Sequence, residues 1–298
     1  MSIIQQIGQG ANNHLTYRAF IGEYISYKCT ERTMKTNDFF ASRAVFSLNE
    51  AARELAPPGG RAGTVQRFKH HLQTGKLKLV CRGIYAVVPA GMEADRFQPD
   101  PFLVAASLKP DGIFSHHSAL ELLGAAHSIW NKYTLYTTHR RRPLVLDHST
   151  ICFLEHPAPF RTSADPDMGT RQVERRGRLL RTTGAERTLV EGFRRPSLAG
   201  GLEELVNSAA SFPVLDLDLL ESLLRRYDTA NLWGACGWFL ERHQRDFHVP
   251  GDLLVLCEKH KPKFPQYLER NSRGGKLIAR WNLILPQSMA ATGGADGP

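Results

Sequence analysis

The sequence predicts an α+β protein, and three stretches carry this prediction. Residues 61–85 change from apolar residues at helical spacing to the alternating pattern of short strands. Between residues 132 and 182 the chain has several short extended segments separated by polar turns. From residue 198 to residue 260 the apolar residues return to helical spacing. We therefore expect a small N-terminal domain, then a larger C-terminal domain with a small mixed sheet and a helical half.

The composition excludes several classes of protein. The chain has 298 residues, 42% of them hydrophobic, and a formal net charge of +9. This length allows two domains, and the positive charge favours a polyanionic partner such as nucleic acid. No window holds the roughly 20 apolar residues that a membrane span requires, and the N-terminus lacks the pattern of a signal peptide. The five cysteines are scattered and form no CxxC pair, which favours a reduced cytoplasmic protein without a membrane partner.

Two short helices are expected before residue 60, at Asn37–Ser42 and at Leu48–Leu55. The second has a strong start signal, because Ser47 and Glu50 match a capping box in which each side chain bonds the other residue's backbone. Pro57–Gly60 cannot continue a helix and is expected to be a turn.

A third helix and a hairpin follow. Val65, Phe68 and Leu72 recur at the spacing of one apolar stripe, which predicts a helix over residues 61–72 that ends at Gly75. Strands are expected at residues 77–80 and 84–88, joined at Arg82-Gly83 by a tight turn that needs positive φ. This order of elements is typical of a winged helix-turn-helix, which we place at residues 34–90.

The helix and hairpin contain no Asp or Glu between residues 61 and 85, so we interpret them as a DNA-binding surface. Arg and Gln side chains on the helix suit guanine and adenine, and basic residues on the hairpin suit phosphates. The alternative is an ordinary solvated basic face. The residues expected to contact DNA are Arg61, Gln66, Arg67, Lys69, His70, Gln73, Lys76, Lys78 and Arg82.

The remaining domain boundaries follow from composition. We interpret residues 1–33 as a poorly ordered extension upstream of a second candidate start at Met34. Residues 91–101 are polar with Gly and Pro and predict a linker, residues 102–286 form the C-terminal domain, and residues 287–298 form a flexible tail.

Helices of the C-terminal domain are expected at residues 102–108 and 115–124, and after a second capping box at Thr183–Glu186. Further helices are expected at 198–210, 217–227, 232–247 and 253–260, and strands at 132–138, 151–154, 172–175, 179–182 and 276–285.

No group of residues makes a convincing catalytic or metal site. Asp216 and Asp218 suit a helix cap better than a nucleotidyltransferase pair, since no Gly-Ser loop lies upstream. His117 and Ser118 are adjacent on a helix and point apart. An alternative zinc site would use His243, His248, Cys257 and His260, although their surroundings resemble helix packing. The basic runs that could add phosphate contacts are Arg140–Arg142 and the cluster Arg175, Arg176, Arg178 and Arg181. We expect no catalytic residue, metal or cofactor.

Five phrases of the sequence together resemble the AbiEi-type antitoxins, the antitoxin and regulator components of type IV toxin–antitoxin systems linked to abortive phage infection. The resemblance extends from about Met34 to Pro286. The phrases, in the family's order, are FSLNEAAREL, LQTGKLKLVCRGIYAV, DPFLVAASLKPDGIFSHHSALELLG, VERRGRLLRTTGAERTLVEGFRRPSLAGGLEELV and RWNLILP.

The resemblance implies an N-terminal domain that binds repeats in its own promoter and represses the operon. It also implies a C-terminal domain that counteracts a nucleotidyltransferase-like toxin, with or without direct contact, and no enzymatic activity. Arg61 and Arg67 match the family's basic helix; Lys76, Lys78 and Arg82 match its basic hairpin. The sequence departs from the family pattern at residues 1–33 and in the long Pro57–Gly60 turn.

Three alternative functions stay open at this point. The chain could be a nucleic-acid-processing enzyme that the N-terminal domain delivers to its substrate, although it contains no Asp/Glu-x-Lys motif of the large metal-dependent nuclease class. It could be a solitary winged-helix regulator. The helical half at residues 198–260 could also dock a protein partner, which is compatible with the antitoxin hypothesis.

Overall fold

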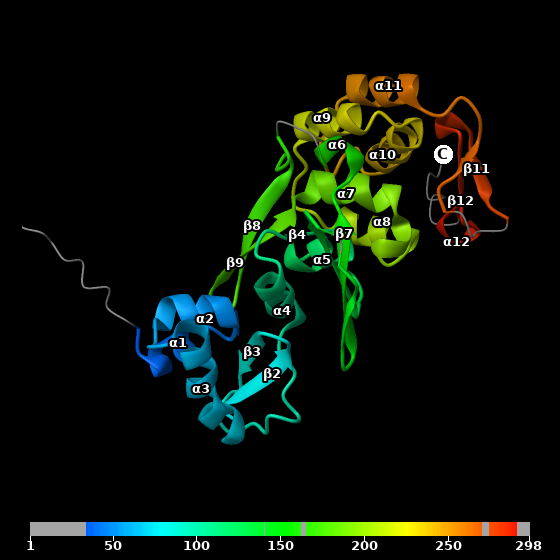
Figure 1. Cartoon of the computed structure of the whole chain (residues 1–298). Helices are drawn as coiled ribbons and strands as arrows, with labels where there is room; N and C mark the ends of the chain where they lie inside the picture. The colour runs from blue at the N-terminus through cyan, green and yellow to red at the C-terminus, as the bar shows by residue number, and fades with distance from the viewer. Residues whose placement is uncertain (1–33, 140, 162–164, 270–273, 291–298) are drawn as a thin grey trace, which may run out of the picture. The chain divides into compact units, whose positions relative to one another are not determined.

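The computed structural model describes residues 34–139, 141–161, 165–269 and 274–290 (Figure 1). These residues form a mixed α+β structure, as expected from the sequence, and their strands make three separate sheets. The expected N-terminal extension and the last eight positions of the expected tail, residues 291–298, lie outside the described residues.

The N-terminal elements follow the expected order. They are α1 (Thr36–Ser42), β1 (Val45–Ser47), α2 (Leu48–Leu55), α3 (Gly60–Gln73), β2 (Leu77–Cys81) and β3 (Ile84–Val87). Strand β3 lies between β1 and β2 and is antiparallel to both. The capping box is confirmed, because Glu50 N donates to Ser47 Oγ at 3.1 Å and Ser47 N donates to Glu50 Oε2 at 3.5 Å. The hairpin turn has its positive φ at Gly83, where φ is 79°.

Aromatic side chains hold these elements together. Phe46 of β1 lies 4.8 Å from Phe39 of α1 and 5.7 Å from Phe68 of α3, measured between ring centroids. Phe68 in turn lies 5.2 Å from Tyr85 of β3. Phe39, Phe46 and Phe68 are fully buried, and burying a Phe side chain contributes about 1.5–3 kcal/mol to folding.

The buried side of α3 differs from the expected stripe. Val65 is 38% exposed, whereas Thr64 is buried beside Phe68. Thr64 can be buried because its hydroxyl donates to Gly60 O at 2.9 Å, which satisfies its only polar group. The buried stripe is therefore Thr64, Phe68 and the half-buried Leu72, and Val65 lies on the exposed side.

A six-stranded mixed sheet forms the centre of the C-terminal part, larger than the small sheet expected. Its strand order is β6-β7-β5-β4-β9-β8, with parallel pairs β5–β7 and β4–β9. Its strands are β4 (Ile113–Phe114), β5 (Lys132–Thr137), β6 (Leu144–Leu146), β7 (Ser149–Glu155), β8 (Thr170–Arg175) and β9 (Arg178–Thr183). Three helices adjoin these strands in sequence, namely α4 (Pro101–Leu108), α5 (His117–Leu122) and α6 (Ala158–Arg161).

A second core joins the N-terminal sheet to this larger sheet. Buried Val45 and Ile84 belong to the same hydrophobic cluster as Phe102 of α4, Ile151 of β7 and Leu180 of β9. The expected linker has no helix or strand between residues 91 and 100, and its Phe97 is buried in this cluster. The expected linker therefore contributes Phe97 to the core, although most of residues 91–100 are exposed.

The helical half is largely as expected. It comprises α7 (Ala185–Arg194), η1 (Pro196–Leu198), α8 (Leu202–Ala210), α9 (Leu217–Tyr227), α10 (Ala230–Arg242) and α11 (Gly251–His260). The cap interpretation of Asp216 is confirmed, because its Oδ1 accepts from Leu219 N at 2.9 Å. Helix α10 ends at Arg242 and not at Phe247, and the chain continues there as turns.

The second expected capping box is wrong. The residue before α7 is Gly184, which has no side chain to cap with. Glu186 instead accepts from Asp216 N at 2.9 Å, and Thr183 Oγ1 lies 2.7 Å from Thr188 Oγ1. Helix α5 also begins without a side-chain cap, since the residue before it is His116, with φ 54° and no capping bond.

The end of the described chain is a small sheet and not one strand. It contains β10 (Gln266–Tyr267), β11 (Lys276–Ile278) and β12 (Leu283–Leu285) in the order β10-β12-β11, with η2 (Ala279–Trp281) between β11 and β12. The chain reverses at Asn282, whose φ is 50°. Residues 287–290, the start of the expected tail, form α12 (Gln287–Ala290), and Met289 is buried.

Glycine at position 237 lets the C-terminal segment pack onto α10. A Cβ at Gly237 would lie 2.2 Å from the ring of Trp281, which is fully buried.

In the part of the chain that the structure describes, the helices lack the length and apolar character needed to span a membrane.

Candidate nucleic-acid interface

One face of α3 carries four of the predicted contact residues as a continuous stripe. Gln66, Lys69, His70 and Gln73 are all exposed and recur at i, i+3, i+4 and i+7, so they share one side of the helix. This side is opposite the buried Thr64. The arrangement gives two amides, an ammonium and an imidazole that can reach base edges or phosphates together.

Arg67 lies beside this stripe and not on it. Its Nη1 is 3.5 Å from Thr36 Oγ1 of α1, so its guanidinium lies toward the first helix. The next residue, Phe68, is buried, and the intervening angle of about 100° per residue separates Arg67 from the centre of the exposed face. Arg67 is exposed and lies at the edge of the candidate interface.

Arg61 and Arg82 line one hollow of about 470 Å³, which we call the arginine hollow. Arg61 comes from the first turn of α3 and Arg82 from the hairpin turn, and Arg53 of α2 lies with them. The turn is fixed to the start of α2 because Leu48 N donates to Gly83 O at 2.8 Å. Three arginines from three successive elements therefore converge on one concave surface.

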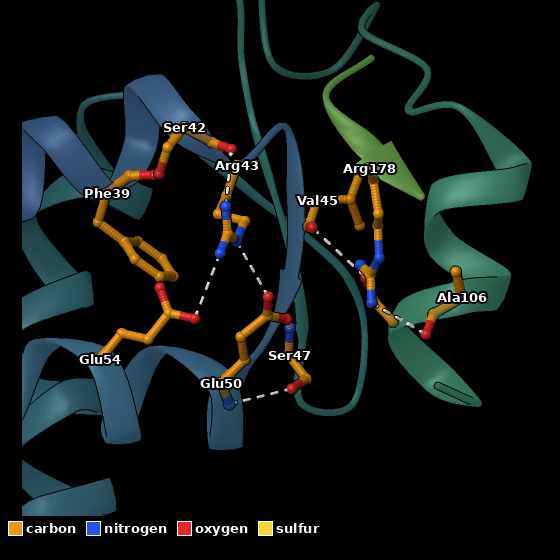
Figure 2. Close-up of polar contacts among 10 residues, drawn as sticks. Phe39, Ser42, Arg43, Val45, Ser47, Glu50, Glu54, Ala106 and Arg178 are labelled. Atoms are coloured by element: carbon orange, nitrogen blue, oxygen red, sulfur yellow. Dashed lines mark hydrogen bonds and ion pairs between the residues drawn. The ribbon is translucent and has the colours of Figure 1, made fainter. Parts of the chain in front are cut away.

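The carboxylates near the arginine hollow are neutralised by Arg43. Glu50 lines the hollow, and its Oε1 lies 3.2 Å from Arg43 Nε, while Arg43 Nη2 lies 3.4 Å from Glu54 Oε1 (Figure 2). Within the described ranges, no ion pair involves Arg53, Arg61 or Arg82. The positive charge of these three guanidinium groups is thus uncompensated, which suits a phosphate.

Arg178 closes the arginine hollow from the six-stranded sheet. Its Nη1 donates to Ser107 Oγ at 2.7 Å and its Nη2 to Ala106 O at 3.2 Å (Figure 2). Ser107 Oγ also lies 3.4 Å from Val45 O of β1. Burial lowers the pKa of the Arg178 guanidinium, and the Glu50 carboxylate opposes this effect. Arg178 therefore links β9, α4 and β1 and holds one wall of the hollow.

The two hairpin lysines have different environments. Lys76 is exposed at the start of the hairpin. Lys78 is half-buried, and its Nζ donates to Phe97 O at 2.7 Å and to Asp95 O at 3.4 Å. Its neighbour on the same strand face, Val80, packs against the second core. A phosphate contact by Lys78 would require its ammonium to leave these two carbonyl groups.

Sequence reasoning named Arg61 and Arg82 but not Arg53. Arg53 lies in the last turn of α2, where a basic residue is also an ordinary complement to the helix dipole. The signal that could have identified it is its position in the helix that precedes α3. The amphipathic pattern of α2 places it on the exposed side, because Ala51 and Leu55 are buried.

Ser118 and His117, the adjacent pair considered as catalytic, each contact a different residue. Ser118 Oγ accepts from Thr134 N at 2.8 Å, whereas His117 Nε2 lies 3.3 Å from Glu204 Oε1. In the zinc alternative, His243 Nδ1 lies 3.0 Å from Asp246 Oδ2 and His260 stacks on Trp233. Across the described segments, no group of three or more His, Cys, Asp or Glu side chains is placed to hold a metal ion.

The other basic runs are partly engaged in ion pairs. Arg175 Nε lies 2.7 Å from Asp100 Oδ2, and Arg181 pairs with Asp167. Arg140 lies outside the described residues, and the Arg141 guanidinium lies 5.5 Å from the ring centroid of Phe153. Arg141, Arg175 and Arg181 thus have partners in the protein, whereas no ion pair involves Arg53, Arg61 or Arg82 within the described residues.

Comparison with known proteins supplies a likeness of fold. No protein-family model and no curated protein matches this chain. Among solved structures, it is similar to "Crystal structure of RV2827C protein from Mycobacterium tuberculosis", with a TM-score of 0.53 and 14% sequence identity. The alignment covers 84% of this chain and 89% of that chain, so the likeness extends over most of the α+β fold.

Proposed function

We propose that residues 34–90 form a winged helix-turn-helix that binds double-stranded DNA, with α3 as the recognition helix and the β2–β3 hairpin as a short wing. The observation that carries this proposal is the convergence of Arg53, Arg61 and Arg82 on one hollow, together with the exposed stripe of α3. The order of helices and strands, and the sheet order β1-β3-β2, agree with this assignment.

In this proposal the two surfaces have different roles. The arginine hollow supplies phosphate contacts, which fix the position of the protein and give most of the salt-dependent affinity. The stripe of Gln66, Lys69, His70 and Gln73 enters the major groove, where Gln can bond adenine through two hydrogen bonds. The hairpin turn is only Arg82-Gly83, so it offers few side chains that could contact bases. The preference for one DNA sequence then depends mainly on the stripe of α3.

We further propose that the chain is the antitoxin and autorepressor of a type IV toxin–antitoxin operon. This part rests on the resemblance to AbiEi-type antitoxins between about Met34 and Pro286. The C-terminal part would counteract a nucleotidyltransferase-like toxin encoded next to it, in the cytoplasm and without enzymatic activity of its own. The alternatives are a solitary regulator and a nucleic-acid-processing enzyme.

Gel-shift titration tests the DNA-binding part. The purified chain should shift the DNA upstream of its own reading frame at concentrations that leave a scrambled duplex free. A double variant with Arg61→Ala and Arg82→Ala should lose the shift, whereas Arg245→Ala, an exposed arginine of the helical half, should retain it. Equal binding of both duplexes would remove the operator from the proposal.

Co-expression tests the antitoxin part separately. The neighbouring reading frame should arrest growth when expressed alone, and this chain should restore growth. If the double variant still restores growth, DNA binding and antitoxicity belong to different surfaces. If the wild-type chain fails to restore growth, the antitoxin assignment is wrong and the solitary regulator is favoured.

A further inference from the structure

Arg194 and Arg195, at the end of α7, lie between two hollows that the DNA-binding proposal does not use. The first, which we call the β7 pocket, has a volume of about 300 Å³ and is lined by Glu155, His156 and Arg161 together with both arginines. The second, the α7 pocket, has a volume of about 590 Å³. Both arginines also line the α7 pocket, and both are exposed.

The two arginines are not paired with the acidic side chain of the β7 pocket. Arg161 Nη2 lies 3.3 Å from Glu155 Oε2, so the carboxylate of the β7 pocket already has a cationic partner. Among the described residues, no ion pair involves Arg194 or Arg195. The C-terminal end of α7 favours cations through its dipole, and the Arg194 guanidinium lies 5.9 Å from the ring centroid of Tyr227, but neither effect supplies an acidic partner.

His156, which lines the β7 pocket, and the buried His116 each have one ring nitrogen without a hydrogen-bond partner among the described residues. His156 Nδ1 and His116 Nε2 are buried without a partner in the described structure. The Tyr136 ring lies between them, with its centroid 5.6 Å from that of His156 and 5.8 Å from that of His116. Burial lowers the pKa of His116, and the charges of Arg195 and Arg194 add to this effect. The protonated ring nitrogen of a neutral imidazole is a suitable donor to an anion.

The α7 pocket supplies groups that recognise the rest of a nucleotide. Tyr267 of β10 is 51% exposed and lines the pocket, so its ring is available to stack on a base. Asn231 and Ser197 line it with polar side chains. A pocket of this volume lies in the usual range for small-molecule sites.

We propose that Arg194 and Arg195 bind the phosphate group of a nucleoside phosphate whose base occupies the α7 pocket against Tyr267. The phosphate receives charge-assisted hydrogen bonds from the two guanidinium groups, and the base stacks on the phenol ring. The nucleoside phosphate is either a free nucleotide or the 5′ end of a nucleic acid strand. This site is separate from α3 and the hairpin, so it does not depend on the DNA-binding proposal.

Calorimetric titration of the full chain tests the site with three probes, namely inorganic phosphate, adenosine and adenosine 5′-monophosphate. The nucleotide should bind in a saturable manner and at least about tenfold more tightly than phosphate or adenosine, since it makes both sets of contacts. The absence of saturable binding, or equal affinity for the nucleotide and adenosine, would overturn the phosphate role. Equal affinity for the nucleotide and phosphate would overturn the base role.

Variants assign the contacts to residues. A double change of Arg194→Gln and Arg195→Gln should weaken nucleotide binding at least about tenfold, and Arg245→Gln should leave it unchanged. Tyr267→Leu should weaken nucleotide binding at least about fivefold, the size of one base–aromatic stack, without changing phosphate binding. An unchanged affinity in either test variant, with an unchanged unfolding temperature, would contradict the assignment.

A 5′-phosphorylated trinucleotide distinguishes the two sources of the ligand. If it binds more tightly than adenosine 5′-monophosphate through Arg194 and Arg195, the site takes a strand end. If it binds more weakly, the site takes a free nucleotide. Either result requires Arg194 and Arg195. If the double variant still binds both the trinucleotide and the nucleotide, the proposed site is excluded.

Discussion

Arg61 and Arg82 line the same hollow, although one begins α3 and the other forms the turn between β2 and β3. The bond from Leu48 N to Gly83 O holds the turn in this position. Both cations lie at one concave surface without acidic partners in the described residues, and in the proposed function they bind one stretch of DNA backbone.

Loss of either arginine should weaken DNA binding for every sequence. Because each phosphate contact releases counterions, Arg61→Ala or Arg82→Ala should reduce the slope of log affinity against log salt by about 0.9. Fluorescence anisotropy at several salt concentrations measures this slope. Arg245→Ala removes the same charge from an exposed site elsewhere and should leave the slope unchanged. A reduced slope in all three variants would indicate a general charge effect.

The two hairpin lysines should respond differently to replacement. Lys76→Ala should weaken DNA binding, because its ammonium is exposed and has no competing bond in the structure. Lys78→Ala should have a smaller effect on DNA binding but should lower the free energy of unfolding by about 1 kcal/mol, through loss of the bond to Phe97 O. Urea unfolding and anisotropy on both variants check this. If Lys76→Ala and Lys78→Ala lose DNA affinity equally, Lys78 also contacts the DNA and this prediction is wrong.

Gln66 should contribute to sequence preference more than to affinity for random DNA. It lies at the N-terminal end of the exposed stripe of α3, where recognition helices contact bases. Gln66→Ala should reduce the difference between the upstream DNA and a scrambled duplex by about 1–3 kcal/mol, with an unchanged salt slope. If both duplexes lose affinity equally, Gln66 contacts the backbone and not a base.

Core replacements should distinguish the buried side of α3 from its exposed side. Phe68→Ala should lower the free energy of unfolding by about 3–5 kcal/mol, because it leaves a cavity among Phe39, Phe46 and Tyr85. Val65→Ala, at a residue that is 38% exposed, should change it by no more than about 0.5 kcal/mol. Chemical denaturation measures both, and a larger loss at Val65 would contradict the orientation of α3.

His116 should make the fold sensitive to acid. Burial, with the charges of Arg195, Arg194 and Arg187, lowers the pKa of His116 from 6.5 to about 3. Between these values the unfolded chain binds a proton that the folded chain does not. The contribution of the neutral His116 to the free energy of unfolding is therefore fully present above pH 6.5. It decreases by about 1.4 kcal/mol per pH unit as the pH falls toward 3.

A variant identifies this contribution. His116→Gln should flatten the dependence of unfolding free energy on pH below 6.5 by one such slope, while His148→Gln, at an exposed turn, should not. Burial also lowers the pKa of His117 and His156, so part of the acid sensitivity should persist in the variant. An unchanged slope in His116→Gln would show that another group takes up the proton.

Local signals predicted the N-terminal elements well. Helix α2 begins and ends at the residues that the Ser47–Glu50 capping box and the Pro57 turn indicated, because both signals act through neighbouring residues. The stripe of exposed residues on α3 also followed from helical spacing. The exposed Val65 did not, because a threonine whose hydroxyl bonds the preceding turn can replace an apolar residue in the core.

Contacts between segments that are distant in the sequence could not be predicted from local patterns. Arg187 and Glu191 are spaced as an ordinary surface ion pair of a helix, yet both are fully buried, with Tyr227 donating to Glu191 at 2.7 Å. The position of Lys78 against Phe97 O and the gathering of Arg53 with Arg61 also depend on how distant segments pack. Helical spacing and capping rules describe single elements and carry no such information.

The most direct test of the DNA-binding proposal is the affinity of the full chain for the DNA upstream of its own reading frame, measured by anisotropy against a scrambled duplex at matched salt. We expect binding to the upstream DNA to be tighter by about 10³-fold or more, and to depend on Arg61 and Arg82. Equal affinity for both duplexes, unchanged by the loss of these arginines, would contradict the proposed role of α3 and the hairpin.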